Sequence, residues 1–170
     1  IHLKLEPEHN IPVINALLYT IIEEGLVNEE FVRDHTIGIE YVKEAVKDYA
    51  PEVVAKYTRL NPEDIRAAAR MYATTKPAVI THGMGVTHFN HGVGGVCDVS
   101  NLFLITGNIC ELGTGDLPLR GQENVQGCCD MGVLPNIFPN LGSVTDPEQR
   151  AWFEKMWHLE PGFLNSKIGI

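Results

Sequence analysis

The chain has 170 residues, enough for one domain with a hydrophobic core, and carries a formal net charge of −9 at pH 7. This acidic balance, without a basic patch, argues against a nucleic-acid-binding protein. No apolar run approaches the ~18 residues of a membrane span and no secretory signal opens the chain, so we expect a cytoplasmic protein without direct membrane contact.

The first 75 residues predict a series of helices. After a short extended lead-in (residues 1–10), apolar residues recur at helical spacing between Pro12 and Gly25. Asn28 is expected to cap a second helix, and residues 41–46 and 53–57 indicate two more. The sequence Asn61-Pro62-Glu63-Asp64 is a helix start, after which we expect four residues to face inward and two arginines outward: Ile65, Ala68, Ala69 and Tyr72, and Arg66 and Arg70.

The middle of the chain changes period. Residues 78–80 form a short apolar run that predicts a buried parallel strand, which leads into a turn at residues 81–85. Residues 93–105 predict a buried helix that ends at Gly107-Asn108. Ligands collect at the carboxyl ends of strands in α/β sheets, so the strand exit is a natural binding edge.

The last predicted element follows a proline-punctuated stretch. Asp146-Pro147 begins a helix whose aromatic residues we expect in the core: Trp152, Phe153 and Trp157. One clear strand between helices indicates the α/β class.

Two glycines in Gly83-Met84-Gly85 resemble a dinucleotide-binding turn, but His88 occupies the place of the third glycine of that fingerprint. The neighbouring His82, His88 and His91 allow a metal site, a polar pocket lining or plain surface positions. A zinc site needs three or four convergent ligands, so the pocket lining is the simpler interpretation and no metal site is assigned.

The four cysteines, at positions 97, 110, 128 and 129, lack the C-x-x-C spacing of an iron–sulfur or zinc site. We expect small buried thiols in a reducing compartment, with an inter-helix disulfide as the alternative.

A polar loop at residues 119–132 is the strongest candidate site. Its glycines let a ligand approach the backbone, its carboxamides match the edges of heterocyclic rings, and Arg120 offers a planar fork for a carboxylate. A lone arginine is by default a surface residue in a salt bridge, so the loop context decides its interpretation.

The segment LRGQENVQGCCDMGVLPNIFPN resembles the RGQNNVQGxxDMGxLPxxYP segment of formate dehydrogenase alpha subunits, within the molybdopterin oxidoreductase family. The turn at residues 83–88 resembles the GMGVTQ turn of the same enzymes, with His88 in place of glutamine. The resemblance implies the helix-rich part of a Rossmann-like domain that binds molybdopterin guanine dinucleotide with molybdenum or tungsten. It implies a formate dehydrogenase activity, in which formate gives carbon dioxide and two electrons pass to an iron–sulfur cluster.

The same resemblance assigns residues. Arg120 becomes the catalytic residue that holds the formate carboxylate, and the cofactor-binding residues are Met84, Gly85, His88, Gly121 and Gln122. Three other polar residues of the loop are interpreted as structural, through caps and bonds to loop amides: Asn124, Gln126 and Asp130.

The cysteine motif for the iron–sulfur cluster and the metal-ligating cysteine of the family are not present, so we expect an internal segment of a longer chain that is inactive alone. Residues 1–118 would end a cofactor-binding α/β domain, and residues 119–170 would form a crossover loop and the start of the next domain. The expected partners are formate or a similar small anion, the remainder of the alpha subunit and electron-transfer subunits. The alternatives are an oxidoreductase for another small oxoanion such as nitrate, and a non-catalytic nucleotide-binding remnant.

Overall fold

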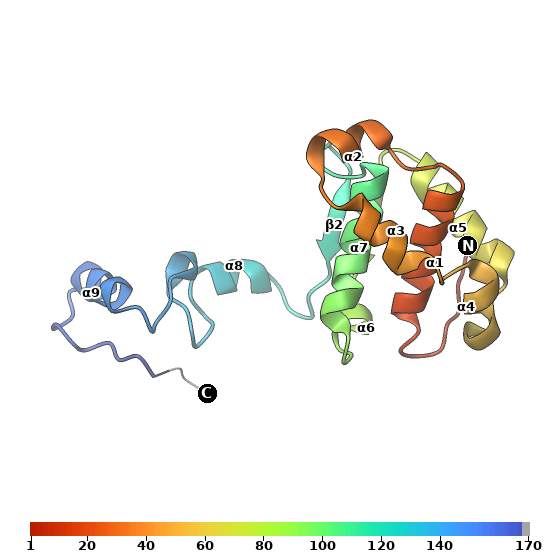
Figure 1. Cartoon of the computed structure of the whole chain (residues 1–170). Helices are drawn as coiled ribbons and strands as arrows, with labels where there is room; N and C mark the ends of the chain where they lie inside the picture. The colour runs from red at the N-terminus through yellow and green to blue at the C-terminus, as the bar shows by residue number, and fades with distance from the viewer. Residues whose placement is uncertain (168–170) are drawn as a thin grey trace. The chain divides into compact units, whose positions relative to one another are not determined.

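The computed structural model describes residues 1–167. The chain divides into two compact units, Ile1–Leu119 and Arg120–Ile170, which are described separately below. Figure 1 colours the chain from the N-terminus to the C-terminus and labels the α-helices and strand β2. The predicted boundary between residues 118 and 119, and its interpretation as a domain crossover, stay predictions.

Two helices of the first unit begin at the caps that the sequence predicts. Asn28 accepts a hydrogen bond from the backbone N–H of Phe31, and Asn61 accepts one from Glu63. These side chains satisfy N–H groups that have no partner inside their own helices. The five helices of this part are α1 (Asn10–Glu23), α2 (Glu29–His35), α3 (Ile39–Val46), α4 (Pro51–Thr58) and α5 (Pro62–Thr74).

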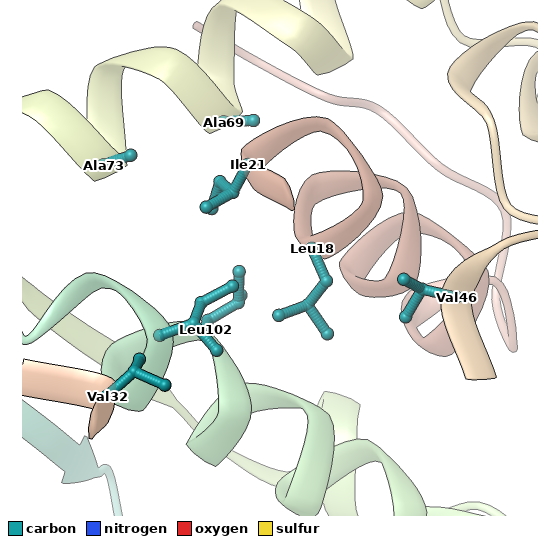
Figure 2. Close-up of a cluster of buried hydrophobic side chains, with 8 residues drawn as sticks. Leu18, Ile21, Val32, Val46, Ala69, Ala73 and Leu102 are labelled. Atoms are coloured by element: carbon teal, nitrogen blue, oxygen red, sulfur yellow. The ribbon is translucent and has the colours of Figure 1, made fainter. Parts of the chain in front are cut away.

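Helix α1 is the centre of the core. Its Leu18 and Ile21 are fully buried, and Figure 2 shows them among apolar side chains from α2, α3, α5 and α7. A second cluster joins α1 to α4 and α5 through Val54 and Ile65. Burial of such side chains contributes about 1.5–3 kcal/mol each.

The two arginines of α5 that were predicted to face outward differ in their exposure. Arg70 is exposed as predicted, but the Arg66 side chain is only 20% exposed because it is held by Glu52 and Glu24. The ion pairs bring a charged residue partly under the surface, which spacing alone does not indicate.

A parallel pair of strands follows: β1 (Val79–His82) and β2 (Gly115–Pro118), with Ile80 opposite Asp116. The prediction of a parallel strand is confirmed, although the observed strand runs to His82. The prediction that it is buried is wrong, since Val79 and Thr81 are exposed. Among the described residues the sheet has two strands, so β1 pairs along one edge only and is not the central strand of a covered parallel sheet.

Between the strands lie the single turn α6 (Met84–Thr87) and α7 (Gly92–Thr106). Helix α7 ends at Gly107, whose φ of 67° is the left-handed conformation that glycine adopts without penalty. The predicted helix and its stop are confirmed. Its burial is confirmed only for the later turns, because Val93 is 82% exposed.

The second unit contains α8 (Val125–Asp130), a short 3₁₀ turn η1 (Pro139–Leu141) and α9 (Pro147–Met156). Asp146 caps α9 by accepting from Glu148 N, as predicted. Phe153 is buried against Phe138, but Trp152 and Trp157 are 53% and 46% exposed. Their assignment to the core is therefore wrong, because a small unit buries only one face of α9.

The cysteines also depart from expectation. All four are free thiols; Cys97, Cys110 and Cys128 are exposed and Cys129 is half-buried. The prediction that these cysteines are small buried thiols is therefore wrong. In the described part of the chain, no helix is both long and apolar enough to cross a bilayer.

Candidate cofactor turn and arginine loop

The turn at residues 83–88 begins where the strand pairing ends. Leu119 N donates to His82 O at 2.7 Å, one residue beyond β2. Val86 N then donates to Gly83 O at 3.1 Å and His88 N to Met84 O at 3.0 Å. These bonds close one helical turn, α6, directly at the exit of β1.

Helices α1 and α7 both contact this turn. Asn10 at the start of α1 donates its Nδ2 to Gly85 O at 2.7 Å. On the α7 side, a Cβ at Gly92 would lie 2.1 Å from Thr87 O, so only glycine permits this approach. Gly95 likewise lies against Val86 and Ile11. The turn is therefore fixed on its inner side.

Its outer side is open. Met84 is 59% exposed, His88 is exposed, and a Cβ at Gly85 would meet nothing within 4 Å. Three of the five residues predicted to bind a cofactor thus share one accessible turn with an uncovered backbone. Such an arrangement can offer a ligand peptide groups, a thioether and an imidazole at the carboxyl end of a parallel strand.

The three histidines of this region have different surroundings. His88 is exposed, and His91 lines a cavity of about 220 Å³ together with Asn10 and Phe89. His82 is 9% exposed and its Nε2 lies 3.2 Å from Asp116 Oδ2 across the β1–β2 pair. Within residues 1–167, no three His, Cys, Asp or Glu side chains converge as metal ligands.

His82 belongs to a buried polar cluster that includes Asp116, Asn108 and Tyr72. Asn108 Nδ2 donates to Thr106 Oγ1 at 3.1 Å and to Tyr72 O at 3.4 Å. Burial raises the pKa of the Tyr72 hydroxyl, while the polar groups of Thr106 and Asn108 oppose the increase. His82 Nδ1, Asn108 Oδ1 and Asp116 Oδ1 are buried without a hydrogen-bond partner among the described residues. Such groups commonly bind an internal water molecule.

The arginine loop opens the second unit. Arg120, Gly121 and Gln122 are exposed and line a shallow hollow with Glu123. Within its own unit, residues 120–167, the Arg120 guanidinium makes no ion pair or hydrogen bond. A Cβ at Gly121 would meet nothing within 4 Å, so the backbone beside Arg120 is uncovered.

Part of the predicted loop is helical, since α8 occupies residues 125–130. Asn124 precedes α8 with a φ of 50° and makes no side-chain cap, although its side chain lies over Gly127. Gln126 and Asp130 are exposed. Of these three residues, only Asn124 shows a structural role, and that role is packing against Gly127, not capping of the helix.

Sequence reasoning gave no role to three polar residues of the first unit. Asn10 and Asp116 form the contacts described above, and Asp98 is half-buried in α7, where burial raises its pKa to about 6. An asparagine directly before a helical pattern is a signal, but it predicts a cap and not a contact 75 residues away. Asp98 could have been found as the only acidic residue in an apolar helix.

No protein-family model matches the chain. Its sequence is 44% identical over all 170 residues to the F420-dependent formate dehydrogenase subunit alpha of Methanocaldococcus jannaschii, 24% of whose length it covers. It is 44% identical over 159 residues to formate dehydrogenase H of Escherichia coli. This match covers 94% of this chain and 22% of the Escherichia coli protein. The chain is homologous to formate dehydrogenase alpha subunits.

The resemblance that residues 119–140 indicated is therefore confirmed. The chain spans about a quarter of the length of these formate dehydrogenase relatives. Nitrate reductases from Synechocystis and Bacillus subtilis are more distant relatives, at 27% and 30% identity. Among solved structures, acetylene hydratase from Pelobacter acetylenicus matches with a TM-score of 0.61 and 28% identity, covering 64% of this chain and 15% of that one. The predicted α/β class is confirmed by the parallel strands and their helices.

Proposed function

We propose that this chain is part of a formate dehydrogenase in which Arg120 binds the substrate carboxylate. The reaction converts formate into carbon dioxide, one proton and two electrons. The supporting observation is an exposed guanidinium, without an ion pair within residues 120–167, in a glycine-rich loop of a chain that is 44% identical over all 170 residues to a formate dehydrogenase alpha subunit.

The open backbone at two places fits a bound dinucleotide cofactor. Met84, Gly85 and His88 on the turn and Gly121 and Gln122 in the loop would hold molybdopterin guanine dinucleotide carrying molybdenum or tungsten. Neither Gly85 nor Gly121 has a heavy atom within 4 Å of a Cβ position, so a planar ligand can approach the peptide groups closely. When bound, that cofactor takes up the two electrons of the reaction.

Arg120 supplies orientation and charge. Two parallel N–H groups of its guanidinium donate to the two formate oxygens, which fixes the direction of the single C–H bond. The positive charge also stabilises the anion as it enters from water. Because no carboxylate of residues 121–167 engages Arg120, binding formate breaks no ion pair within the second unit.

The rest of the machinery lies with partners. Residues 1–118 would end a Rossmann-like cofactor domain, and residues 119–170 would lead into the next. The remainder of an alpha subunit and its electron-transfer subunits would provide the iron–sulfur cluster. We place the enzyme in the cytoplasm. Relatives about four times as long as this chain support the need for these partners.

Nitrate is the second candidate substrate. It is supported by nitrate reductases among the relatives, and a guanidinium also fits a planar oxoanion. Their identity of 27–30%, against 44% for the formate dehydrogenases, makes formate the first choice.

The test replaces Arg120 in the cofactor-loaded enzyme that contains this sequence. Arg120→Ala should lower kcat/KM for formate about 100-fold, since a charge-assisted bidentate contact is lost. Arg59→Ala is the matched control, because the Arg59 side chain is 85% exposed and its ion pair to Glu6 spans 4.0 Å. Dye reduction with formate and dye oxidation with nitrate are measured on both variants. Full formate activity in Arg120→Ala, or activity with nitrate alone, contradicts the proposal.

A further inference from the structure

Asn10 contacts the turn at residues 83–88 directly, although it lies far from that turn in the sequence. It is the first residue of α1. An asparagine near a helix start commonly caps the helix, because its side-chain oxygen accepts a hydrogen bond from a backbone N–H. Helix α1 has no side-chain cap. The Asn10 carboxamide instead donates to the carbonyl oxygen of Gly85, 75 residues later in the sequence, at 2.7 Å.

Two hydrogen bonds hold the planar peptide group that joins Gly85 and Val86: Val86 N donates to Gly83 O within the turn, and Gly85 O accepts from Asn10 outside it. The carbonyls of Gly83 and Met84 accept from N–H groups of the turn itself, whereas the Gly85 carbonyl accepts from Asn10. Gly85 has no side chain and open space around its Cα, so local packing does not restrict its rotation. Glycine is also the residue with the widest backbone freedom, so a hydrogen bond from outside the turn restricts its orientation further.

We propose that Asn10 is a positioning residue that preorganises the turn for its ligand. By holding the carbonyl of Gly85, it ties the turn that carries the exposed Met84 and His88 to the start of α1. Preorganised binding groups avoid the entropy cost of ordering on association, and rigid helices position them best. The inference rests on the proposed function, since it names a residue that acts through the cofactor turn.

The cavity beside the turn provides a matched control. Asn10 and Asn90 both line the cavity of about 220 Å³, but Asn90 makes no side-chain hydrogen bond within residues 1–167. Asn10→Asp and Asn90→Asp therefore introduce the same nearly isosteric carboxylate into the same cavity. Only Asn10→Asp removes the donor to Gly85 and places a second acceptor against its carbonyl.

Two measurements test the proposal. The first is backbone amide hydrogen exchange of Val86 and His88 in the cofactor-free protein. The second is the pterin content per chain after production with cofactor supply, read from the fluorescence of released oxidised pterin. Asn10→Asp should raise exchange and lower pterin content, each about fivefold, as expected for one hydrogen bond. Asn90→Asp should match the wild type in both, and Asn10→Gln, which keeps the donor, should recover part of the content.

The outcomes separate the two proposals. Both measurements use the enzyme that contains this sequence, and a wild-type enzyme without pterin refutes the proposed function and, with it, this inference. A wild-type protein that binds pterin, with equal pterin content in Asn10→Asp, refutes the inference alone. Faster exchange with unchanged pterin content also refutes it, because Asn10 would then stabilise the turn without preparing it for a ligand.

Discussion

Gly92 and Gly94 lie two residues apart at the start of α7, yet their surroundings differ completely. A Cβ at Gly92 would lie 2.1 Å from Thr87 O, whereas a Cβ at Gly94 would meet nothing within 4 Å. The first glycine permits α6 and α7 to touch. The second is a helical glycine that costs conformational entropy without allowing any contact.

These surroundings predict opposite effects of the same substitution. Gly92→Ala should lower the free energy of unfolding by about 2–3 kcal/mol, because the backbone of α6 must move. Gly94→Ala should raise it by up to ~1 kcal/mol through helix propensity. Urea denaturation followed by circular dichroism measures both. Equal effects would show that α6 does not pack on α7 as described.

Asp98 has an unusual environment for a carboxyl group. Burial raises its pKa from 3.8 to about 6, since it is half-buried on the apolar helix α7. The folded protein thus keeps the proton to about pH 6, whereas the unfolded chain releases it near pH 4. The free energy of unfolding therefore falls as the pH rises through this interval, and the loss persists at pH 7.

Asp98→Asn should remove this penalty. After allowance for solvent screening, the variant should be more stable than the wild type by roughly 1–2 kcal/mol at pH 7 and equal to it at about pH 4. Glu24→Gln is expected to behave oppositely, because a hydrogen bond from Arg70 lowers the pKa of Glu24 and makes its charge stabilising. Urea titrations at several pH values compare the variants. A constant difference for Asp98→Asn across this range would contradict the pKa shift.

At the scale of the elements, the sequence predicts the helices that have local start signals. It does not predict how exposed a strand is. Asn28, Asn61 and Asp146 act within two or three residues of their position, so the sequence contains the whole cause. Strand β2, with the sequence Gly-Asp-Leu-Pro, has little strand propensity and exists through its pairing with β1. The exposure of β1 likewise depends on what surrounds it, which its apolar residues do not encode.

The candidate site shows the same division. The loop residues 120–122 were found because their sequence is distinctive, and the turn because glycines follow a strand. The contact of Asn10 with Gly85 was not found, because a residue separation of 75 leaves no periodic signal. The same holds for His82 and Asp116, which meet only through the register of β1 and β2. Long-range partners depend on tertiary packing, and a single sequence records them only as ordinary polar residues.

At the scale of the whole molecule, the two units differ in the apolar surface that they bury. The first contains both buried clusters around α1, whereas the buried apolar side chains of the second are Phe138 and Phe153. A small core offsets little of the entropy cost of ordering a chain. Residues 120–167 should therefore unfold more readily than residues 1–119.

The two tryptophans make this difference measurable, since both Trp152 and Trp157 lie in the second unit. Tryptophan emission should change at lower urea concentration than far-ultraviolet circular dichroism, which mainly reports the helices around α1. Phe153→Ala should shift only the emission transition, by about 3–4 kcal/mol, and Leu18→Ala should shift only the dichroism transition, by about 2–5 kcal/mol. Coincident transitions that move together in both variants would show one cooperative unit instead of two.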